Sequence, residues 1–289
     1  MTTPAVHKTV TSLRAAIAGW RKAGESVALV PTMGALHAGH LSLVTLGRQR
    51  ARRVVVSIFV NPTQFAPDED FSRYPRDLQK DLAMLAEAGA DAVFSPEPAE
   101  MYPPDFSTSI SLTGPATAGL EDRFRPTHFQ GVATVVAKLL IQALPDVAIF
   151  GEKDFQQLAV IRCLVADLDS PVEIVGAPIM REKDGLAMSS RNVYLDERQR
   201  KFASTLYLAM EWAARRVGEG DDPVIALREA AASICADGFQ IDYIELRDAA
   251  TLAPAEPGRR EGLRVLVAAR MGKTRLIDNI AGPAASKKG

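Results

Sequence analysis

The sequence predicts an α/β protein in which a doubly wound parallel sheet is followed by a second, smaller α+β domain. Up to about residue 180, short β-rich runs alternate with helical patterns, as expected for parallel strands joined by helices. After Met180 the order changes, because two helical patterns come before three β-rich runs. The hydrophobic content of 47% and the charged content of 24% are ordinary for a globular protein.

The first part of the chain contains the predicted parallel sheet. Strands are predicted at residues 27–30, 53–60, 91–96, 146–150 and 172–179, with an edge strand at 107–112. Helices are predicted at 40–50, 77–90, 129–144 and 155–168, where apolar residues recur with helical spacing. This β–α–β order is Rossmann-like, and such sheets bind their ligands beyond the carboxyl ends of the strands.

The second part is predicted to be a smaller α+β domain. Helices are expected at residues 196–217 and 223–236, and strands at 243–246, 263–270 and 274–280. Helices followed by strands in this order favour an antiparallel sheet. We therefore expect one domain over residues 1–179 and a C-terminal domain over residues 180–289.

Charge and composition exclude several classes of partner. The 34 Lys and Arg residues nearly cancel the 35 Asp and Glu residues, so no global charge favours a nucleic acid or a membrane surface. No apolar run approaches the ~20 residues of a membrane span, and the N-terminus is unlike a secretory signal. The prediction is a cytoplasmic protein without a membrane partner. Its two cysteines, Cys163 and Cys235, are expected to be buried free thiols.

The stretch PTMGALHAGH at residues 31–40 is the main candidate for a ligand site. It lies where a predicted strand turns into a helix, and it contains two of the four histidines of the chain. Gly34 and Gly39 let the backbone approach a ligand, and the N–H groups at a helix start favour an anion. Because His37 and His40 are three residues apart, both can face one phosphate.

The residues alone leave two other roles open for this histidine pair. The pair is also compatible with a structural role or with a metal site, since spaced histidines are common zinc ligands. No cysteine motif or second histidine-rich segment supplies further ligands of that kind. The glycine pattern of dinucleotide-binding proteins and the P-loop pattern are both absent after this strand.

Two further polar segments follow predicted strands. In GEKDFQQL, residues 151–158, Lys153 is well placed to bind phosphate, whereas Asp154 and Gln157 also fit a capping box for the next helix. In VNPTQF, residues 60–65, Asn61 and Gln64 offer amide groups at the same sheet edge or simply form a turn.

Two segments outside the strand ends are also candidates. REKDGLAMSSRN, residues 181–192, concentrates hydroxyl groups and a guanidinium in Ser189, Ser190 and Arg191; it suits a phosphate-binding loop or an interdomain linker. In RPTHFQG, residues 125–131, Thr127 and Gln130 form a possible capping box, so that His128 is either functional or incidental.

Taken together and in this order, these stretches resemble the pantothenate synthetase (pantoate–β-alanine ligase) family. The resemblance continues through YIELRD and VLVAAR and covers essentially the whole chain. The HxGH turn and the MSSR loop are similar to the nucleotide-handling signatures of class I aminoacyl-tRNA synthetases and nucleotidylyltransferases. The resemblance implies that pantoate is activated by MgATP as pantoyl adenylate, with release of pyrophosphate. β-Alanine then forms the amide bond and releases AMP.

The resemblance also implies roles for individual residues. Contacts with the ATP phosphates are implied for His37, His40, Lys153, Ser189, Ser190 and Arg191, with His40 as proton donor. The rest of the ATP site is implied to be Met33, Gly34, Ala35, Leu36, Ala38, Gly39, Gly151, Glu152, Asp154, Met180 and Met188. Pantoate and β-alanine are implied to meet Gln64, Gln157, Asn61 and His128. Residues 1–179 would be the ATP- and pantoate-binding domain and residues 180–289 its lid.

Some positions depart from the family pattern. Ala38 stands where many members have a glutamate inside the HxGH turn, a change expected to be tolerated. Lys80 and Asp81 stand where some members have two acidic residues near magnesium, which makes Asp81 a weak metal candidate. Mg²⁺ is then held mainly by ATP oxygens. A homodimer is implied by the resemblance alone.

Two alternatives differ in what they require at the second-substrate positions. Another HxGH nucleotidylyltransferase needs cationic residues for a second phosphate where Gln64 and Gln157 stand. A non-catalytic nucleotide-binding protein would keep the ATP contacts without needing those two glutamines.

Overall fold

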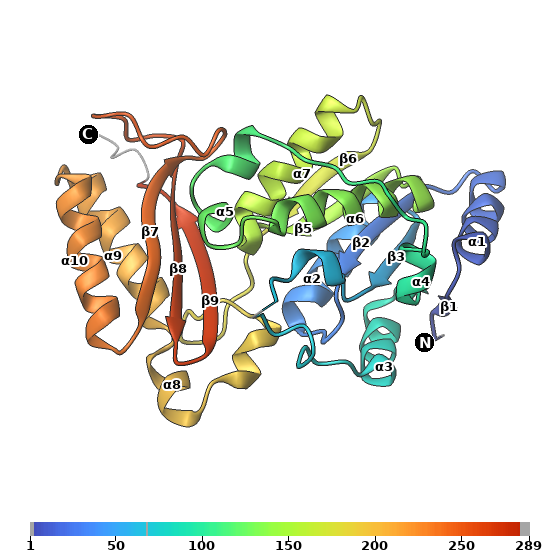
Figure 1. The fold of residues 1–289 in the computed structure, drawn as a ribbon, viewed down its shortest axis with the longest axis horizontal. Helices are drawn as coiled ribbons and strands as arrows, with labels where there is room; N and C mark the ends of the chain where they lie inside the picture. Colours follow the sequence, from blue (N-terminus) through green and yellow to red (C-terminus); the bar gives the residue numbers. More distant parts are fainter. Residues whose placement is uncertain (1–2, 68, 284–289) are drawn as a thin grey trace. The chain divides into compact units, whose positions relative to one another are not determined.

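The computed structural model describes residues 3–67 and 69–283, and the chain divides into two compact units (Figure 1). The first unit contains residues up to Thr117, 125–152 and 157–178. The second contains 118–124, 153–156 and the chain from Ile179 onward. The sequence suggested a single boundary near residue 179, and it did not predict that the two short segments group with the second unit.

The first unit is built on a six-stranded parallel sheet with the strand order β1-β4-β3-β2-β5-β6. Its strands are β1 Ala5–His7, β2 Val27–Thr32, β3 Arg53–Ile58, β4 Ala92–Phe94, β5 Val147–Gly151 and β6 Glu173–Ala177. From β2 the chain winds outward through β3 to β4, and after β5 it winds the other way to β6. This order confirms the doubly wound fold that the sequence predicted.

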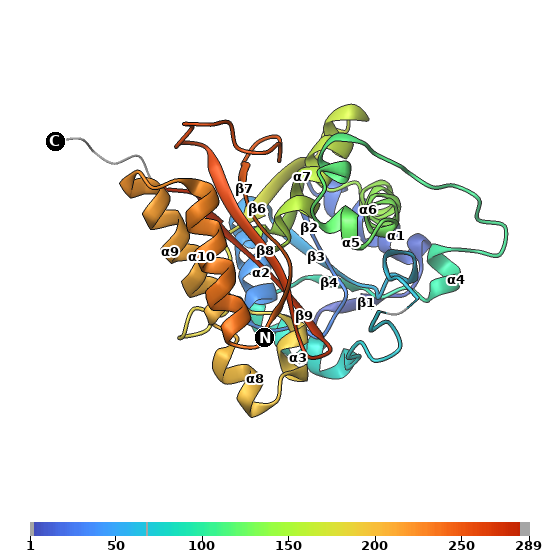
Figure 2. The ribbon, with the colours of Figure 1, turned by 60° about the vertical axis from the view of Figure 1, so that its left-hand side comes forward.

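Helices cover both faces of this sheet (Figure 2). Val27 and Leu29 of β2 pack in one core cluster with α1 Val10–Lys22, α6 His128–Ala143 and α7 Phe155–Asp167. Ala28 and Val30 pack on the other face with α2 Ala38–Arg50 and α3 Leu78–Ala88. Since successive side chains of a strand point to opposite faces, a strand covered on both sides must be apolar throughout, as this one is.

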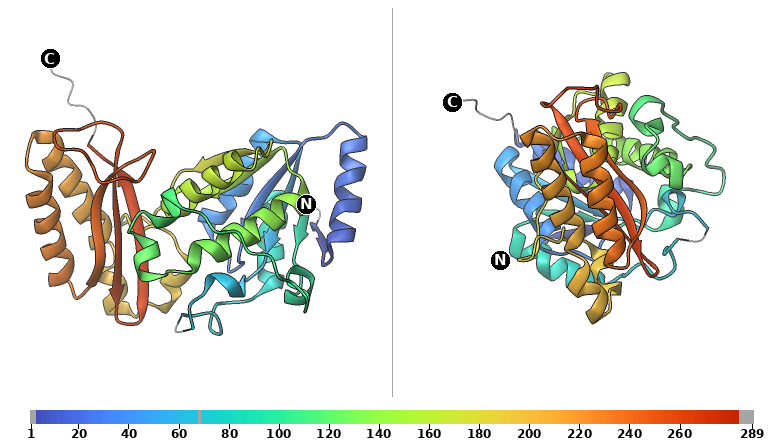
Figure 3. Two further views of the ribbon diagram at one scale, coloured as in Figure 1. Left: turned by 45° about the horizontal axis from the view of Figure 1, so that its top comes forward. Right: turned by 90° about the vertical axis from the view of Figure 1, so that its left-hand side faces the viewer.

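The second unit contains an antiparallel sheet in the order β7-β8-β9. Its strands are β7 Gln240–Asp248, β8 Leu263–Met271 and β9 Thr274–Ala281. The helices α9 Thr205–Glu219 and α10 Pro223–Ala236 lie side by side against this sheet (Figure 3). Among the described residues, the short helices are α4 Pro98–Met101 in the first unit and α5 Glu121–Phe124 and α8 Glu197–Phe202 in the second.

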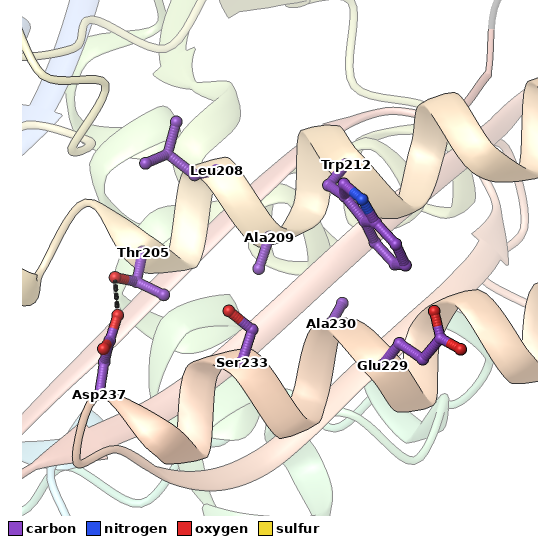
Figure 4. A pocket seen from close by; sticks show the side chains of 8 residues that line it. All are labelled: Thr205, Leu208, Ala209, Trp212, Glu229, Ala230, Ser233 and Asp237. Atoms are coloured by element: carbon purple, nitrogen blue, oxygen red, sulfur yellow. Dashed lines mark hydrogen bonds between the residues drawn. The ribbon is translucent and has the colours of Figure 1, made fainter.

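A cavity of about 400 Å³ lies between α9 and α10 (Figure 4). Ala209 and Ala230 are buried where the two helices pack together, and Trp212 lines the cavity beside them. At one end the hydroxyl of Thr205 donates to Asp237 at 2.5 Å. None of the residues predicted to bind a substrate lines this cavity.

Several expectations about local structure were wrong. Residues 107–112 form no strand; the sheet edge beside β4 is taken by β1, and the N–H of Ile110 donates to Thr134 at 2.9 Å instead. The strand β1 and the helix α1 near the N-terminus were not predicted. The helix expected over 196–217 is divided into α8 and α9. Both cysteines are free, but Cys163 is only half-buried and Cys235 is exposed.

Within the described part of the chain, none of the helices combines the length and the apolar content that a membrane span requires.

Candidate active site

The switch in winding direction occurs between the neighbouring strands β2 and β5. In open α/β sheets, a crevice for ligands forms at such a point, outside the carboxyl ends of the two strands. The 33–40 stretch follows β2 directly, and Gly151 is the last residue of β5. The fold therefore places the HxGH turn where a doubly wound sheet binds ligands.

The two histidines form the start of α2. His37 is the N-cap residue, and its Nδ1 accepts the N–H of Gly39 at 3.1 Å. The Nδ1 of His40 accepts the N–H of His37 at 3.3 Å, and the two ring centroids are 4.1 Å apart. A neutral imidazole that accepts at Nδ1 carries its proton at Nε2. Both rings therefore have Nε2 as their donor atom.

Asp81 holds the loop that leads to these histidines. This buried side chain comes from α3, and its two carboxylate oxygens accept the N–H groups of Ala35 at 3.0 Å and Leu36 at 2.9 Å. Ala35 has a φ of 51°, in the left-handed region that a residue with a Cβ seldom adopts. Burial raises the pKa of Asp81, while the two N–H groups oppose that shift. The sequence had singled out Asp81 for metal binding and contained no sign of this contact.

The turn after β3 carries a buried amide network. The Nδ2 of Asn61 donates to Oε1 of Gln64 at 3.0 Å and to the carbonyl of Gly131 at 3.2 Å. Its Oδ1 accepts the hydroxyls of Thr63 at 2.9 Å and Tyr102 at 2.8 Å. Asn61 is only 1% exposed, so this side chain is part of the turn's interior.

His128 supports the backbone of the same turn. One ring nitrogen, Nδ1, is 3.0 Å from the carbonyl oxygen of Gln64, which can only accept, so Nδ1 carries the proton. The other, Nε2, lies 3.1 Å from Nη1 of Arg125, whose guanidinium also pairs with Glu69. Both nitrogens of this buried ring therefore have protein partners.

In the second unit, β9 fixes the residues around Lys153. The Nδ2 of Asn279 donates to the carbonyl oxygen of Lys153 at 2.9 Å, and the ammonium of Lys153 is 3.8 Å from Asp154. Arg181 donates to both carboxylate oxygens of Asp278, at 2.6 and 3.0 Å. Burial raises the pKa of Asp278, and the neighbouring guanidinium opposes that shift.

Arg181, Asp278 and Asn279 were not among the site residues predicted from the sequence. For Asp278 and Asn279, the signal that could have indicated them is a pair of polar residues among the apolar residues Leu276, Ile277 and Ile280 of β9.

The Ser-Ser-Arg motif lies in a capped turn of the second unit. The N–H of Met188 donates to the carbonyl of Met180 at 2.9 Å, which closes a short hairpin just before the motif. Ser189 then caps the 3₁₀ turn Ser190–Tyr194, because its hydroxyl oxygen accepts the N–H of Arg191 at 3.2 Å. The motif is thus a defined turn and not an irregular linker.

The two consecutive glutamines at the start of α7, Gln156 and Gln157, have different surroundings. Gln156 is buried: its Oε1 accepts the N–H of Glu121 and its Nε2 donates to Asp122, each at 2.8 Å. Gln157 is half-buried. The capping box expected at Thr127 was wrong, because that side chain makes no capping hydrogen bond.

A parallel doubly wound sheet with an HxGH helix start at its switch point defines a nucleotide-handling α/β protein. The model of the pantoate-beta-alanine ligase family matches residues 5–281, and the chain belongs to this family. The pantothenate synthetase of Nitrobacter hamburgensis is 56% identical over 277 residues, which cover 96% of this chain and 98% of that protein. That of Mesorhizobium japonicum is 55% identical over 286 residues, 99% of this chain and 100% of that protein.

Solved structures agree with this membership. The pantothenate synthetase of Thermus thermophilus has a TM-score of 0.91 and 47% identity, covering 97% of this chain and 100% of that one. A pantoate-beta-alanine ligase from Francisella tularensis, complexed with beta-gamma ATP and beta-alanine, has a TM-score of 0.81 and 33% identity over 96% of this chain and 97% of that one. The family and the enzyme class predicted from the sequence, an amide-forming ligase, are thereby confirmed.

Proposed function

We propose that this chain condenses pantoate with β-alanine in two steps, each driven by a good leaving group. A pantoate carboxylate oxygen attacks the α-phosphorus of ATP; an O–P bond forms, the bond to the β-phosphate oxygen breaks, and pyrophosphate leaves. The amine of β-alanine then attacks the acyl carbon, loses a proton and expels AMP. Neither step needs a covalent bond to the protein, so alignment and charge stabilisation supply the catalysis.

The observation that carries this proposal is the imidazole cap at the start of α2. Because both Nδ1 atoms accept backbone N–H groups, His37 and His40 have Nε2–H as donor groups at a helix start that attracts anions. Hydrogen bonds from these groups to phosphate oxygens stabilise the charge that develops as pyrophosphate leaves. His40 has the role of proton donor.

The remaining roles extend the same proposal to the rest of the predicted set. Further phosphate contacts come from Lys153, Ser189, Ser190 and Arg191. The adenosine pocket is formed by Met33, Gly34, Ala35, Leu36, Ala38, Gly39, Gly151, Glu152, Asp154, Met180 and Met188. Gln64 and Gln157 bind pantoate. For Asn61 and His128, the protein partners described above favour a role through Gln64 over direct contact with the substrate.

Magnesium enters this proposal as part of the MgATP substrate. Among the residues that the structure describes, no group of three His, Cys, Asp or Glu side chains is arranged to hold a metal ion. Mg²⁺ in such enzymes is commonly held by phosphate oxygens with one or two carboxylates. Both oxygens of Asp81 already accept backbone N–H groups, which favours a role in holding the loop over a direct contact with magnesium.

The proposal includes a homodimer and a lid role for the residues after 179, which rest on family resemblance, and a cytoplasmic location, which rests on the sequence composition and the N-terminal pattern. Analytical ultracentrifugation tests the first of these.

A substrate-dependence assay tests the function. Purified protein is given MgATP, pantoate and β-alanine singly, in pairs and together, and pyrophosphate, AMP and pantothenate are measured. We expect pyrophosphate release only when MgATP and pantoate are both present, and AMP with pantothenate only after β-alanine is added. Release with a different acid and none with pantoate would instead favour another nucleotidylyltransferase. ATP binding with no release under any condition would favour a non-catalytic nucleotide-binding protein.

A further inference from the structure

The orientation of the Asn61 amide is fixed by two backbone groups. The carbonyl of Gly131 can only accept a hydrogen bond, and it lies 3.2 Å from Nδ2. The N–H of Thr63 can only donate, and it lies 3.4 Å from Oδ1. Exchanging the oxygen and nitrogen of Asn61 would oppose both groups, so only one orientation of this amide is compatible with the turn.

This orientation determines which end of the Gln64 amide faces Asn61. The Nδ2 of Asn61 donates to Oε1 of Gln64 at 3.0 Å, so the nitrogen of the Gln64 amide faces away from Asn61. That nitrogen lies 3.2 Å from the sulfur of Met33, a weak acceptor. Gln64 therefore presents its N–H groups, and a ligand oxygen is a better partner for them than the thioether.

Tyr102 holds the oxygen side of Asn61. Its hydroxyl donates to Oδ1 at 2.8 Å from a residue 41 positions further along the chain. The ring is confined by Phe59 and Phe106, with centroids 6.1 and 5.1 Å away. Burial raises the pKa of the Tyr102 hydroxyl, so it stays protonated and able to donate near neutral pH.

We infer that Tyr102 is a positioning residue for the acid substrate: through Asn61 it keeps the Gln64 amide with its N–H groups toward the substrate. This inference rests on the proposed contact between Gln64 and pantoate. The carboxylate of pantoate is an acceptor, and its hydroxyl oxygens accept as well. A Gln64 amide turned by 180° would present its oxygen and repel that carboxylate.

The expected effect of Tyr102→Phe follows from the hydrogen bonds that Asn61 keeps in this variant. The Oδ1 atom keeps the hydroxyl and the N–H of Thr63, so the amide loosens but does not invert. Losing one hydrogen bond of ordinary net strength predicts a rise in the KM for pantoate of about fivefold. The KM for ATP and kcat should change by less than about twofold, because no phosphate contact is altered.

A double-mutant cycle tests whether Tyr102 acts through Gln64. Initial rates of pyrophosphate release are measured for the wild type, Tyr102→Phe, Gln64→Ala and the double variant, with pantoate varied. We expect Tyr102→Phe to raise the pantoate KM in the wild-type background and to have no effect on the KM in the Gln64→Ala background. Tyr207→Phe is the matched control, since its hydroxyl donates to Glu211 in the second unit, and its pantoate KM should equal that of the wild type.

Partial unfolding cannot imitate the expected result, because a loss of folded protein lowers the apparent kcat and leaves KM unchanged. Equal effects of Tyr102→Phe in both backgrounds, or no effect in the wild-type background, would overturn the inference while leaving the proposed function intact. If Gln64→Ala itself leaves the pantoate KM unchanged, the proposed pantoate contact and this inference are both wrong.

Discussion

Replacing Gly131 by alanine should displace the turn that carries Asn61 and Gln64. Gly131 lies in α6, where a Cβ atom built on its backbone would be 2.5 Å from the carbonyl carbon of Thr63 and 2.7 Å from the nitrogen of Gln64. Both are backbone atoms, so no side-chain rotation relieves the overlap. The helix and the turn must therefore move apart.

The size of the effect follows from these distances. To bring the 2.5 Å contact to between 3.0 and 3.4 Å, the turn must move by at least 0.5 to 0.9 Å, because the carbonyl oxygen of Thr63 lies closer still. Overpacking of this kind costs about 1–3 kcal/mol of unfolding free energy, partly offset by the gain of up to about 1 kcal/mol when alanine replaces glycine in a helix. A displacement near 1 Å of a substrate-positioning group lowers the rate by about 10²-fold.

The assay compares Gly131→Ala with Gly19→Ala, the matched control. Gly19 is an exposed helical glycine of α1, and a Cβ there meets nothing within 4 Å. The control should gain about 0.5–1 kcal/mol of stability in urea unfolding and keep wild-type kinetics. Gly131→Ala should lose stability and about 10²-fold in kcat/KM for pantoate, measured by pyrophosphate release. Wild-type kinetics and stability in Gly131→Ala would refute the close packing of α6 on this turn.

Three further predictions concern other parts of the protein. His40→Ala should slow adenylate formation in single turnovers by at least about 10²-fold, the loss typical of a positioned transition-state donor. Asp81→Asn should cost about 1–3 kcal/mol of stability, because one loop N–H then faces an amide N–H₂, and it should slow adenylation without changing the Mg²⁺ concentration that gives half the maximal rate. Asp248→Asn should destabilise the protein at pH 7 by about 1–2 kcal/mol, with a smaller difference at pH 3. The hydroxyl and N–H of Thr251 lower the pKa of Asp248 in the folded state. The Asp248 carboxylate therefore stabilises the fold fully at pH values above its pKa in the unfolded chain, about 3.9. This stabilisation is lost as the pH falls through its lower pKa in the folded state.

Each of these has an outcome that contradicts it. Wild-type single-turnover rates in His40→Ala would remove His40 from the mechanism. A higher Mg²⁺ requirement in Asp81→Asn would make Asp81 a metal ligand. A destabilisation by Asp248→Asn that is equal at pH 7 and pH 3 would mean that the carboxylate charge of Asp248 does not stabilise the fold.

Much of the sheet was predictable because its strands are covered on both faces. The apolar runs at residues 53–60 and 146–150 need no knowledge of their partners to be recognised as buried strands. The edge was not predictable in this way. β1 has only three residues with an exposed pattern, whereas the more strand-like stretch at 107–112 forms no strand, because pairing at an edge depends on which segment the fold brings there.

The types of side chain in the candidate site could also be predicted from the sequence. Histidine, lysine, serine and arginine groups that suit phosphate occur directly after strands or in one turn, and their order along the chain identified the family. The hydrogen-bond partners of each side chain could not be predicted from the sequence. Asp81 was predicted as a weak metal candidate and Asn61 as a residue near pantoate, and no sequence pattern showed that both side chains also bind the loops that carry other candidates.

The sequence by itself determined the doubly wound fold, the family and the residue types at the strand ends, because periodicity and local motifs are properties of neighbouring residues. Only the tertiary structure decided which atoms of the site's side chains donate hydrogen bonds and which accept them. The tautomer of the two histidines and the orientation of the Gln64 amide follow from backbone groups held opposite them. The histidine tautomers depend on N–H groups only two and three residues away, once the turn has folded. The Gln64 amide depends on a contact across the fold, between Asn61 and Gly131, which no local sequence pattern records.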